Sequence, residues 1–145
     1  MTPLSVLVVD DDAGIRAGLE IHFRRQGWEV RGASGAAEAL AKFRQAPAPL
    51  VVTDMRLSES GQNDRGDDGL AVIAGVRALA PETAVILLTA FGSVPGAVAA
   101  MRAGACDYLM KPVAFPHLLA AAERLLSRPG SGAGRPAGPA SGDAG

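Results

Sequence analysis

The sequence predicts an α/β fold in which one parallel sheet is covered by helices on both faces. Short apolar, β-branched runs alternate with amphipathic segments of helical period as far as Ser127, and most connections between them are short. Strands that alternate with helices in this way form parallel sheets. The chain has 145 residues, of which 48% are hydrophobic and 20% charged, so we expect one domain with a sizeable core.

The first strand and helix are expected at residues 5–9 and 13–26. The run SVLVV is apolar and β-branched, which is typical of a strand buried on both faces. Asp12 can cap the helix that follows. Three apolar residues of this helix share one face: Ile15, Leu19 and Phe23.

The middle of the chain repeats this alternation. We expect a strand at residues 28–33, a helix at 35–45 that Ser34 can cap, and a strand at 49–54. A polar stretch then leads to a helix at residues 70–80. Four of its apolar residues recur at helical spacing: Leu70, Ile73, Val76 and Leu79.

The last part of the chain adds two more strand and helix pairs. The strands are expected at residues 83–90 and 105–110, and the helices at 94–104 and 115–127. Five strands and five helices in a chain of this length favour a flavodoxin-like, doubly wound parallel sheet with strand order 2-1-3-4-5. The functional site of such a sheet lies just beyond the carboxyl ends of its strands.

Residues 129–145 have a different composition. Fifteen of these 17 residues are Gly, Pro, Ala or Ser, and none is a large apolar residue. Such a segment cannot bury enough surface to offset the entropy lost on ordering. We therefore expect one folded domain over residues 1–128 and a disordered tail or linker over 129–145.

Composition and charge argue against several classes of partner. The net charge of −1 provides no basic surface for direct nucleic-acid binding. We expect no signal peptide and no membrane span, because no apolar run approaches the length of about 20 residues that a spanning helix needs. The single cysteine, Cys106, is expected to be a small core residue and fits a reducing cytoplasm, which is the expected location.

Reactive side chains follow four of the five expected strands. Asp10 and Asp11 follow the first strand, Asp54 ends the third, Thr89 lies near the end of the fourth, and Lys111 follows the fifth. These groups should meet at one edge of the sheet. Clustered carboxylates need a cation, and an all-oxygen set with few protein ligands suits Mg²⁺.

This group of side chains has the chemistry needed for phosphoryl transfer. Asp54 is the natural nucleophile, because a carboxylate can attack phosphorus to form an acyl phosphate. A metal on Asp10 and Asp11, the Lys111 ammonium and the Thr89 hydroxyl would then face the negative phosphoryl oxygens.

Four motifs together resemble the receiver domain of bacterial two-component response regulators: VLVVDDD, VVTDMRL, LLTAFGS and DYLMKP. The resemblance covers approximately residues 4–127, and the segment TAFGSVPGAVAAMRAGACDYLMKP is most similar to receivers of NtrC-type transcription activators. It implies that Asp54 accepts a phosphoryl group from a sensor histidine kinase in a Mg²⁺-dependent reaction. The protein would be a phosphorelay signalling switch that changes partner binding, not an enzyme acting on a metabolite.

The resemblance also implies roles for individual residues. The metal ligands would be Asp10, Asp11, Asp54 and the backbone carbonyl of Arg56. Thr89 and Tyr108 would move together on phosphorylation, and the peptide bond before Pro112 would be cis. The surface formed by residues 94–104, 105–110 and 115–127 would bind an output partner or a second copy of the chain.

One feature departs from the family pattern, and two residues could affect the lifetime of the acyl phosphate. The loop between the third strand and the next helix, residues 58–68, is long and acidic, with Ser58 where most receivers have proline. A tolerated surface insertion is the default interpretation, and a flap limiting access to Asp54 is the alternative. Phe91, two residues beyond Thr89, would exclude water from the acyl phosphate, and Arg56 flanks the same path.

Two other classes of function remain as alternatives. A phosphatase or phosphotransferase resembling the haloacid dehalogenase superfamily would use Asp10 as nucleophile and Asp12 as acid/base. Gly14 stands where that family prefers Thr or Val, and no cap domain is evident. A nucleotide or flavin binder is disfavoured because the turn DDDAG has no glycine-rich phosphate cradle.

Overall fold

A computed structural model describes residues 4–55, 68–89 and 94–127. They form one five-stranded parallel sheet in the order β2-β1-β3-β4-β5, which confirms the predicted flavodoxin-like topology. The strands are β1 (Ser5–Val9), β2 (Glu29–Ala33), β3 (Leu50–Asp54), β4 (Ala84–Thr89) and β5 (Asp107–Met110). The helices are α1 (Ala13–Arg25), α2 (Ala36–Gln45), α3 (Asp68–Leu79), α4 (Val94–Ala103) and α5 (Phe115–Ser127).

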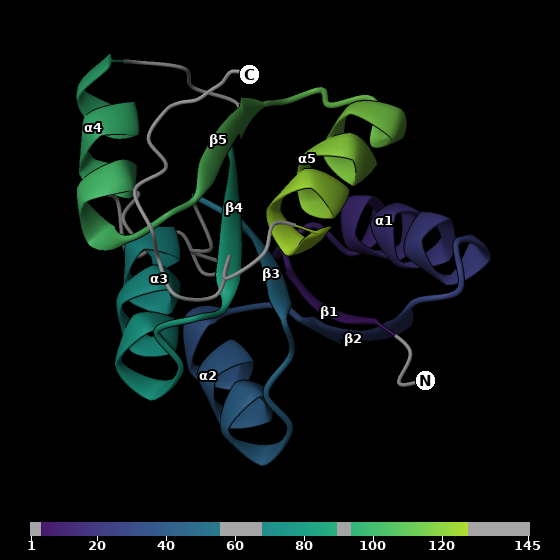
Figure 1. Cartoon of the computed structure of the whole chain (residues 1–145), viewed down its shortest axis with the longest axis horizontal. Helices are drawn as coiled ribbons and strands as arrows, with labels where there is room; N and C mark the ends of the chain where they lie inside the picture. The colour runs from purple at the N-terminus through teal and green to yellow at the C-terminus, as the bar shows by residue number, and fades with distance from the viewer. Residues whose placement is uncertain (1–3, 56–67, 90–93, 128–145) are drawn as a thin grey trace.

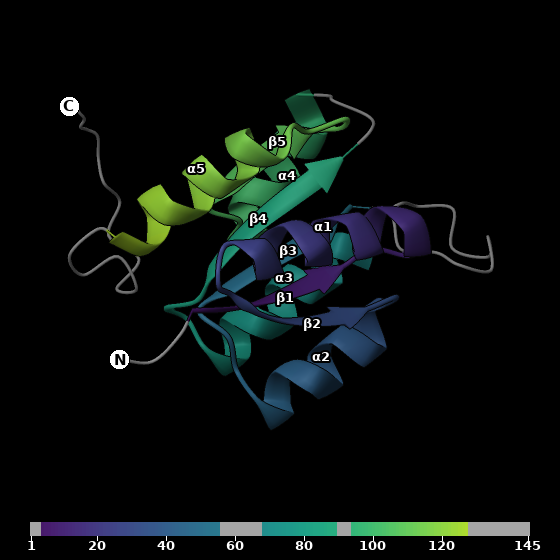
Figure 2. The ribbon, with the colours of Figure 1, turned by 90° about the vertical axis from the view of Figure 1, so that its right-hand side faces the viewer.

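The helices lie in two layers on either side of the sheet. Figure 1 shows α2, α3 and α4 on one face and α1 and α5 on the other, and Figure 2 views the sheet from the α1 and α5 side. Successive strand residues point to opposite faces, so β1 contributes Leu7 and Val9 to one core and Val6 and Val8 to the other. This two-sided burial explains why the central strands are continuous apolar runs.

Helix α1 begins as predicted. The Asp12 carboxylate accepts a hydrogen bond from the Ile15 N–H at 3.0 Å, which satisfies one of the unpaired donors of the first turn. Leu19 and Phe23 are buried against the sheet, and Ile15 is 41% exposed. It lies in the first turn, one turn before Leu19, at the edge of the buried face.

Helix α2 begins differently from the prediction. Its N-cap is Gly35 and not Ser34. The Ser34 N–H and hydroxyl both donate to Oε1 of Glu38, at 2.9 and 3.1 Å, so a carboxylate from inside the helix binds the segment before it. Glu38 also pairs with Lys42 one turn later, at 3.0 Å. The backbone hydrogen bond from Ser34 and the hydrogen bond from Lys42 lower the pKa of Glu38 to about 2.

This lowered pKa predicts a small acid dependence of stability. Ionised Glu38 stabilises the fold above its ordinary pKa of 4.5, and the contribution is lost as the pH falls towards about 2. We expect Glu38→Gln to lower the free energy of unfolding at pH 7 by less than about 1 kcal/mol, because the site is exposed. Urea unfolding of both proteins at pH 7 and pH 3 measures this difference. A difference that grows between pH 7 and pH 3 would contradict the assignment.

The buried face of α3 contains Val72, Ile73 and Val76, and Leu79 lies off that face with 45% exposure. One expectation about burial is wrong. Cys106 is exposed because β5 begins only at Asp107, and its sulfur accepts a hydrogen bond from Arg77 Nη2 at 3.3 Å. Among the helices of the described ranges, none is long and apolar enough to cross a membrane.

Candidate functional site

The segment after β1 is fixed by hydrogen bonds on both its backbone and its side chain. The Asp10 N–H donates to the carbonyl of Ala33 at 3.0 Å, and the Asp10 carbonyl accepts a hydrogen bond from Arg16 at 2.7 Å. The Asp10 carboxylate accepts a further hydrogen bond from the Asp12 N–H at 2.9 Å. Asp10 is therefore held at the carboxyl edge of the sheet, where it is only 1% exposed.

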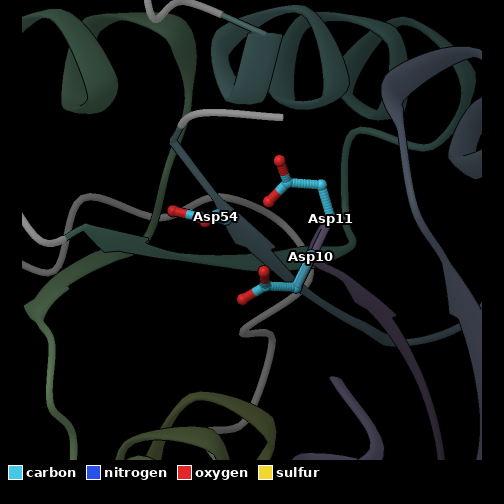
Figure 3. A group of neighbouring side chains, drawn as sticks. All are labelled: Asp10, Asp11 and Asp54. Atoms are coloured by element: carbon cyan, nitrogen blue, oxygen red, sulfur yellow. The ribbon is translucent and has the colours of Figure 1, made fainter. Parts of the chain in front are cut away.

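Three carboxylates meet at this edge (Figure 3). Asp10 and Asp11 come from the end of β1 and Asp54 from the end of β3, and one carboxylate oxygen from each lies within 4.8 Å of the others. Asp10 and Asp54 are buried, and Asp11 is half-buried. Like charges this close and this poorly solvated repel strongly, so the cluster requires cations.

Lys111 supplies one of these positive charges. Its ammonium lies 3.0 Å from Asp10 Oδ2 and 3.0 Å from Asp54 Oδ2, and its side chain is 16% exposed. Burial alone would lower the pKa of Lys111, but the hydrogen bonds to Asp54 and Asp10 outweigh it and raise the pKa above its usual value. The group is a firmly protonated cation between two carboxylates.

The donor set fits a second, divalent cation. Within this group of four side chains, one ammonium faces three carboxylates, so a divalent ion would balance the remaining charge. All the donors are oxygen atoms, which hard cations prefer. The three aspartates can therefore hold a metal ion at the open edge of the sheet.

Thr89 and Tyr108 lie on the strands next to the cluster. Thr89 is the last residue of β4, is 1% exposed, and its carbonyl accepts the Lys111 N–H at 2.7 Å. Tyr108 pairs with Leu87 across β4 and β5 and packs, partly buried, against the core beneath α2, α3 and α4. Thr89 therefore adjoins the site directly, while Tyr108 lies further down the neighbouring strand. The Lys111–Pro112 peptide bond is cis.

Arg56, Phe91 and residues 58–67 lie outside the described residues, as does the Asp68 side chain. Their expected roles as a metal ligand, a water barrier and a flap are therefore not tested by this geometry.

Two residues that the sequence analysis did not single out also touch the site. Gly69 lies in the first turn of α3, and its N–H donates to the Met55 carbonyl just beyond β3 at 2.8 Å. A Cβ atom at Gly69 would lie 2.3 Å from the Asp54 carbonyl oxygen. Arg16 lies one helical turn after the N-cap residue Asp12, and its side chain points back towards the cluster. Its spacing from Asp12 is the sequence feature that could have indicated this.

Comparisons with known proteins agree with this arrangement. The family model of the response regulator receiver domain matches residues 6–123. The chain is 37% identical over 124 residues to the transcriptional regulatory protein ZraR of Salmonella typhimurium, a match that covers 86% of this chain and 26% of ZraR. The chain thus spans about a quarter of the length of that relative.

Solved structures show the same fold. The receiver domain of NtrX from Brucella abortus aligns with a TM-score of 0.72 at 34% identity, covering 82% of this chain and 95% of that one. A response regulator from Burkholderia pseudomallei, solved with a phosphorylated aspartic acid, a calcium ion and citrate, aligns with a TM-score of 0.73 at 30% identity, covering 87% of this chain and 75% of that one. The similarity to ZraR and NtrX agrees with the predicted resemblance to NtrC-type receivers.

Proposed function

The chain belongs to the response regulator receiver family, and we propose that it is a signalling switch in which Asp54 accepts a phosphoryl group from a sensor histidine kinase. The observation that supports this role is the position of Asp54, at the end of the central strand β3. Its carboxylate lies 3.0 Å from the Lys111 ammonium and within 4.8 Å of oxygens from Asp10 and Asp11. A carboxylate surrounded by cation-binding groups is suited to attack a negatively charged phosphoryl group.

The proposed transfer forms one bond and breaks one. An Asp54 oxygen attacks the phosphorus of a phosphohistidine, the P–N bond breaks, and its electron pair stays on the imidazole nitrogen. Lys111 then faces a phosphoryl oxygen, and the Thr89 hydroxyl donates a hydrogen bond to another. Dephosphorylation is the attack of water on phosphorus, which releases inorganic phosphate and restores the Asp54 carboxylate.

Mg²⁺ is the proposed metal. Asp10, Asp11 and Asp54 would hold it, with the backbone carbonyl of Arg56 as a further ligand and water completing the shell. When bound, it supplies positive charge against the phosphoryl oxygens. The observation in support is the donor set itself, which is all oxygen and carries more negative charge than Lys111 balances.

The output of the proposed switch is a change in binding. Phosphorylation would bias two arrangements of Thr89 and Tyr108 and of the surface formed by α4, β5 and α5. An output domain, a partner protein or a second copy of the chain would bind one arrangement better. We propose no direct nucleic-acid binding by this unit and no turnover of a metabolite beyond its own phosphorylation and dephosphorylation.

The proposed setting follows from the partner. A histidine kinase draws its phosphoryl group from ATP, so the proposed location is the cytoplasm. The proposed domain organisation is a receiver over residues 1–128 followed by a tail or linker over 129–145.

Metal dependence tests this proposal. The protein is incubated with acetyl phosphate in Mg²⁺ or in EDTA, and phosphoprotein is measured over time. We expect labelling in Mg²⁺ and almost none in EDTA, with Asp10→Asn and Asp11→Asn also labelled slowly in Mg²⁺. Equal labelling in Mg²⁺ and EDTA would contradict the proposed site.

The haloacid dehalogenase alternative makes Asp10 the nucleophile. The Lys111 ammonium lies 3.0 Å from a carboxylate oxygen of both Asp10 and Asp54, and Asp10 also accepts the Asp12 N–H. Asp10 is 1% exposed and Asp54 is 8% exposed, and this slightly greater exposure favours Asp54 as the acceptor.

We propose that the phosphorylated state lasts minutes or longer, because the sequence predicts that a bulky apolar residue at Phe91 would exclude water. We predict that Phe91→Ser shortens the lifetime of phosphorylated protein severalfold, measured as its decay after the phosphodonor is removed. Decay in denaturant should be equal for both proteins, because the acyl phosphate is then equally solvated. An unchanged decay rate in the folded variant would contradict this role.

A further inference from the structure

Arg16 contacts the backbone of the acidic cluster. Its Nη1 atom donates a hydrogen bond to the Asp10 carbonyl oxygen at 2.7 Å. This carbonyl lies beyond β1, which ends at Val9. The guanidinium of Arg16 thus provides a hydrogen-bond donor at the point where the chain leaves the sheet and enters the cluster.

The position of Arg16 is itself supported by its surroundings. Arg16 Nε lies 4.0 Å from Glu20 Oε2, and the two side chains are 24% and 19% exposed. Both pack over Gly32 at the end of β2, where a Cβ atom would lie 2.0 Å from Glu20 Oε2 and 3.3 Å from Arg16 Cδ. The side chains of Arg16 and Glu20 therefore occupy the space that a side chain at position 32 would otherwise fill.

The contact fixes a peptide plane that two of the aspartates share. The carbonyl of Asp10 and the N–H of Asp11 belong to one planar unit. Holding the carbonyl sets the direction in which the chain continues to Asp11. The Asp10 side chain has its own fixed contacts, with the Asp12 N–H at 2.9 Å and Lys111 at 3.0 Å.

We propose that Arg16 is a positioning residue, which holds the Asp10–Asp11 peptide so that the Asp11 carboxylate points into the cation site. This inference rests on the proposed function, because it assumes that the cluster binds Mg²⁺. Groups that orient metal ligands commonly affect metal affinity without touching the metal.

The sign of the effect separates positioning from simple electrostatics. Arg16 carries a positive charge close to a cation site, so removing that charge alone would strengthen Mg²⁺ binding. Loss of positioning would weaken it. A weaker affinity in a neutral variant is therefore explained by positioning and not by charge.

Calorimetric titration of the unphosphorylated protein with Mg²⁺ tests the inference. We expect Arg16→Met, which keeps the apolar stem, to raise the Mg²⁺ dissociation constant on the order of tenfold. Arg16→Lys should recover part of the loss, because its ammonium can donate to the same carbonyl. The matched control is Arg25→Met on the same helix, where the exposed side chain should leave the affinity unchanged.

Thermal unfolding in EDTA and at one high Mg²⁺ concentration shows whether Arg16 affects metal binding or only the stability of the fold. Ligand binding stabilises the fold according to affinity, so weaker binding in Arg16→Met should shrink the Mg²⁺-induced rise in Tm. An equal rise in Arg16→Met and the parent, or Mg²⁺ binding as tight as that of the parent, would overturn the inference. No saturable Mg²⁺ binding by the parent would overturn the proposed function as well, so the two failures are distinguishable.

Discussion

The Lys111→Met variant is expected to accept phosphate from a small phosphodonor about 100-fold more slowly than the parent. The Lys111 ammonium lies 3.0 Å from the Asp54 carboxylate that is proposed to attack phosphorus. During the transfer, negative charge develops on the phosphoryl oxygens, and the Lys111 ammonium is close enough to Asp54 to stabilise it. Removing the ammonium takes away one of the preorganised donors to that charge and leaves the Thr89 hydroxyl and the metal in place.

Initial rates of phosphoprotein formation at saturating Mg²⁺ measure this effect. The matched control is Lys42→Met, which removes an ammonium that pairs with Glu38 at 3.0 Å on α2. The control should phosphorylate at the parent rate. A Lys111→Met variant as fast as the control would show that Lys111 has no part in the transfer.

The same substitution should lower stability when no divalent ion is present. Lys111 bridges Asp10 and Asp54, and its loss leaves two buried carboxylates close together, at a cost of about 2 kcal/mol after allowance for partial exposure. Because the pKa of Lys111 is raised, the ammonium stabilises the fold below its usual pKa and this contribution is lost as the pH rises through the folded value. Urea unfolding in EDTA at pH 7 should show the full difference, and added Mg²⁺ should reduce it.

The Gly69→Ala variant is expected to be less stable than the parent by about 2–3 kcal/mol. Its Cβ atom would lie 2.3 Å from the Asp54 carbonyl oxygen and 2.8 Å from the Met55 Cα. Both neighbours are backbone atoms, so relief requires that α3 or the end of β3 move. Such a movement would also displace Asp54, and we expect slower phosphorylation by acetyl phosphate.

Gly18→Ala is the matched control for this substitution. Gly18 lies inside α1, and a Cβ atom there would meet no other atom within 4 Å. Alanine has the better helix propensity, so this variant should be more stable than the parent by about 0.5–1 kcal/mol. If Gly69→Ala is as stable as Gly18→Ala in urea unfolding, the close approach of α3 to β3 is not a constraint.

The sheet and its helices could be predicted because local patterns determine them. Continuous apolar runs such as Val6–Val9 identify strands buried on both faces, and the spacing of Leu19 and Phe23 identifies a helix face. The errors are at the ends of elements. The N-cap of α2 is Gly35 and not Ser34, and Cys106 continues an apolar pattern but lies just before β5 and is exposed.

The site was predictable only in part. The rule that functional groups follow parallel strands was enough to bring Asp10, Asp11, Asp54 and Lys111 together. It could not predict that the Lys111 side chain extends far enough for these contacts. Lys111 follows β5, and its ammonium passes β4 to contact Asp54 at the end of β3 and Asp10 after β1. Arg16 and Gly69 contact the backbone near the site, and the hydrophobic patterns used to identify strands and helices do not report such contacts.

Intact-mass spectrometry after treatment with acetyl phosphate and Mg²⁺ tests the central proposal most directly, with Asp54→Asn and Asp10→Asn treated in parallel. We expect one addition of about 80 Da on the parent, dependent on Mg²⁺, and none on Asp54→Asn. Labelling that persists in Asp54→Asn and disappears in Asp10→Asn would contradict the assignment of Asp54 as the acceptor.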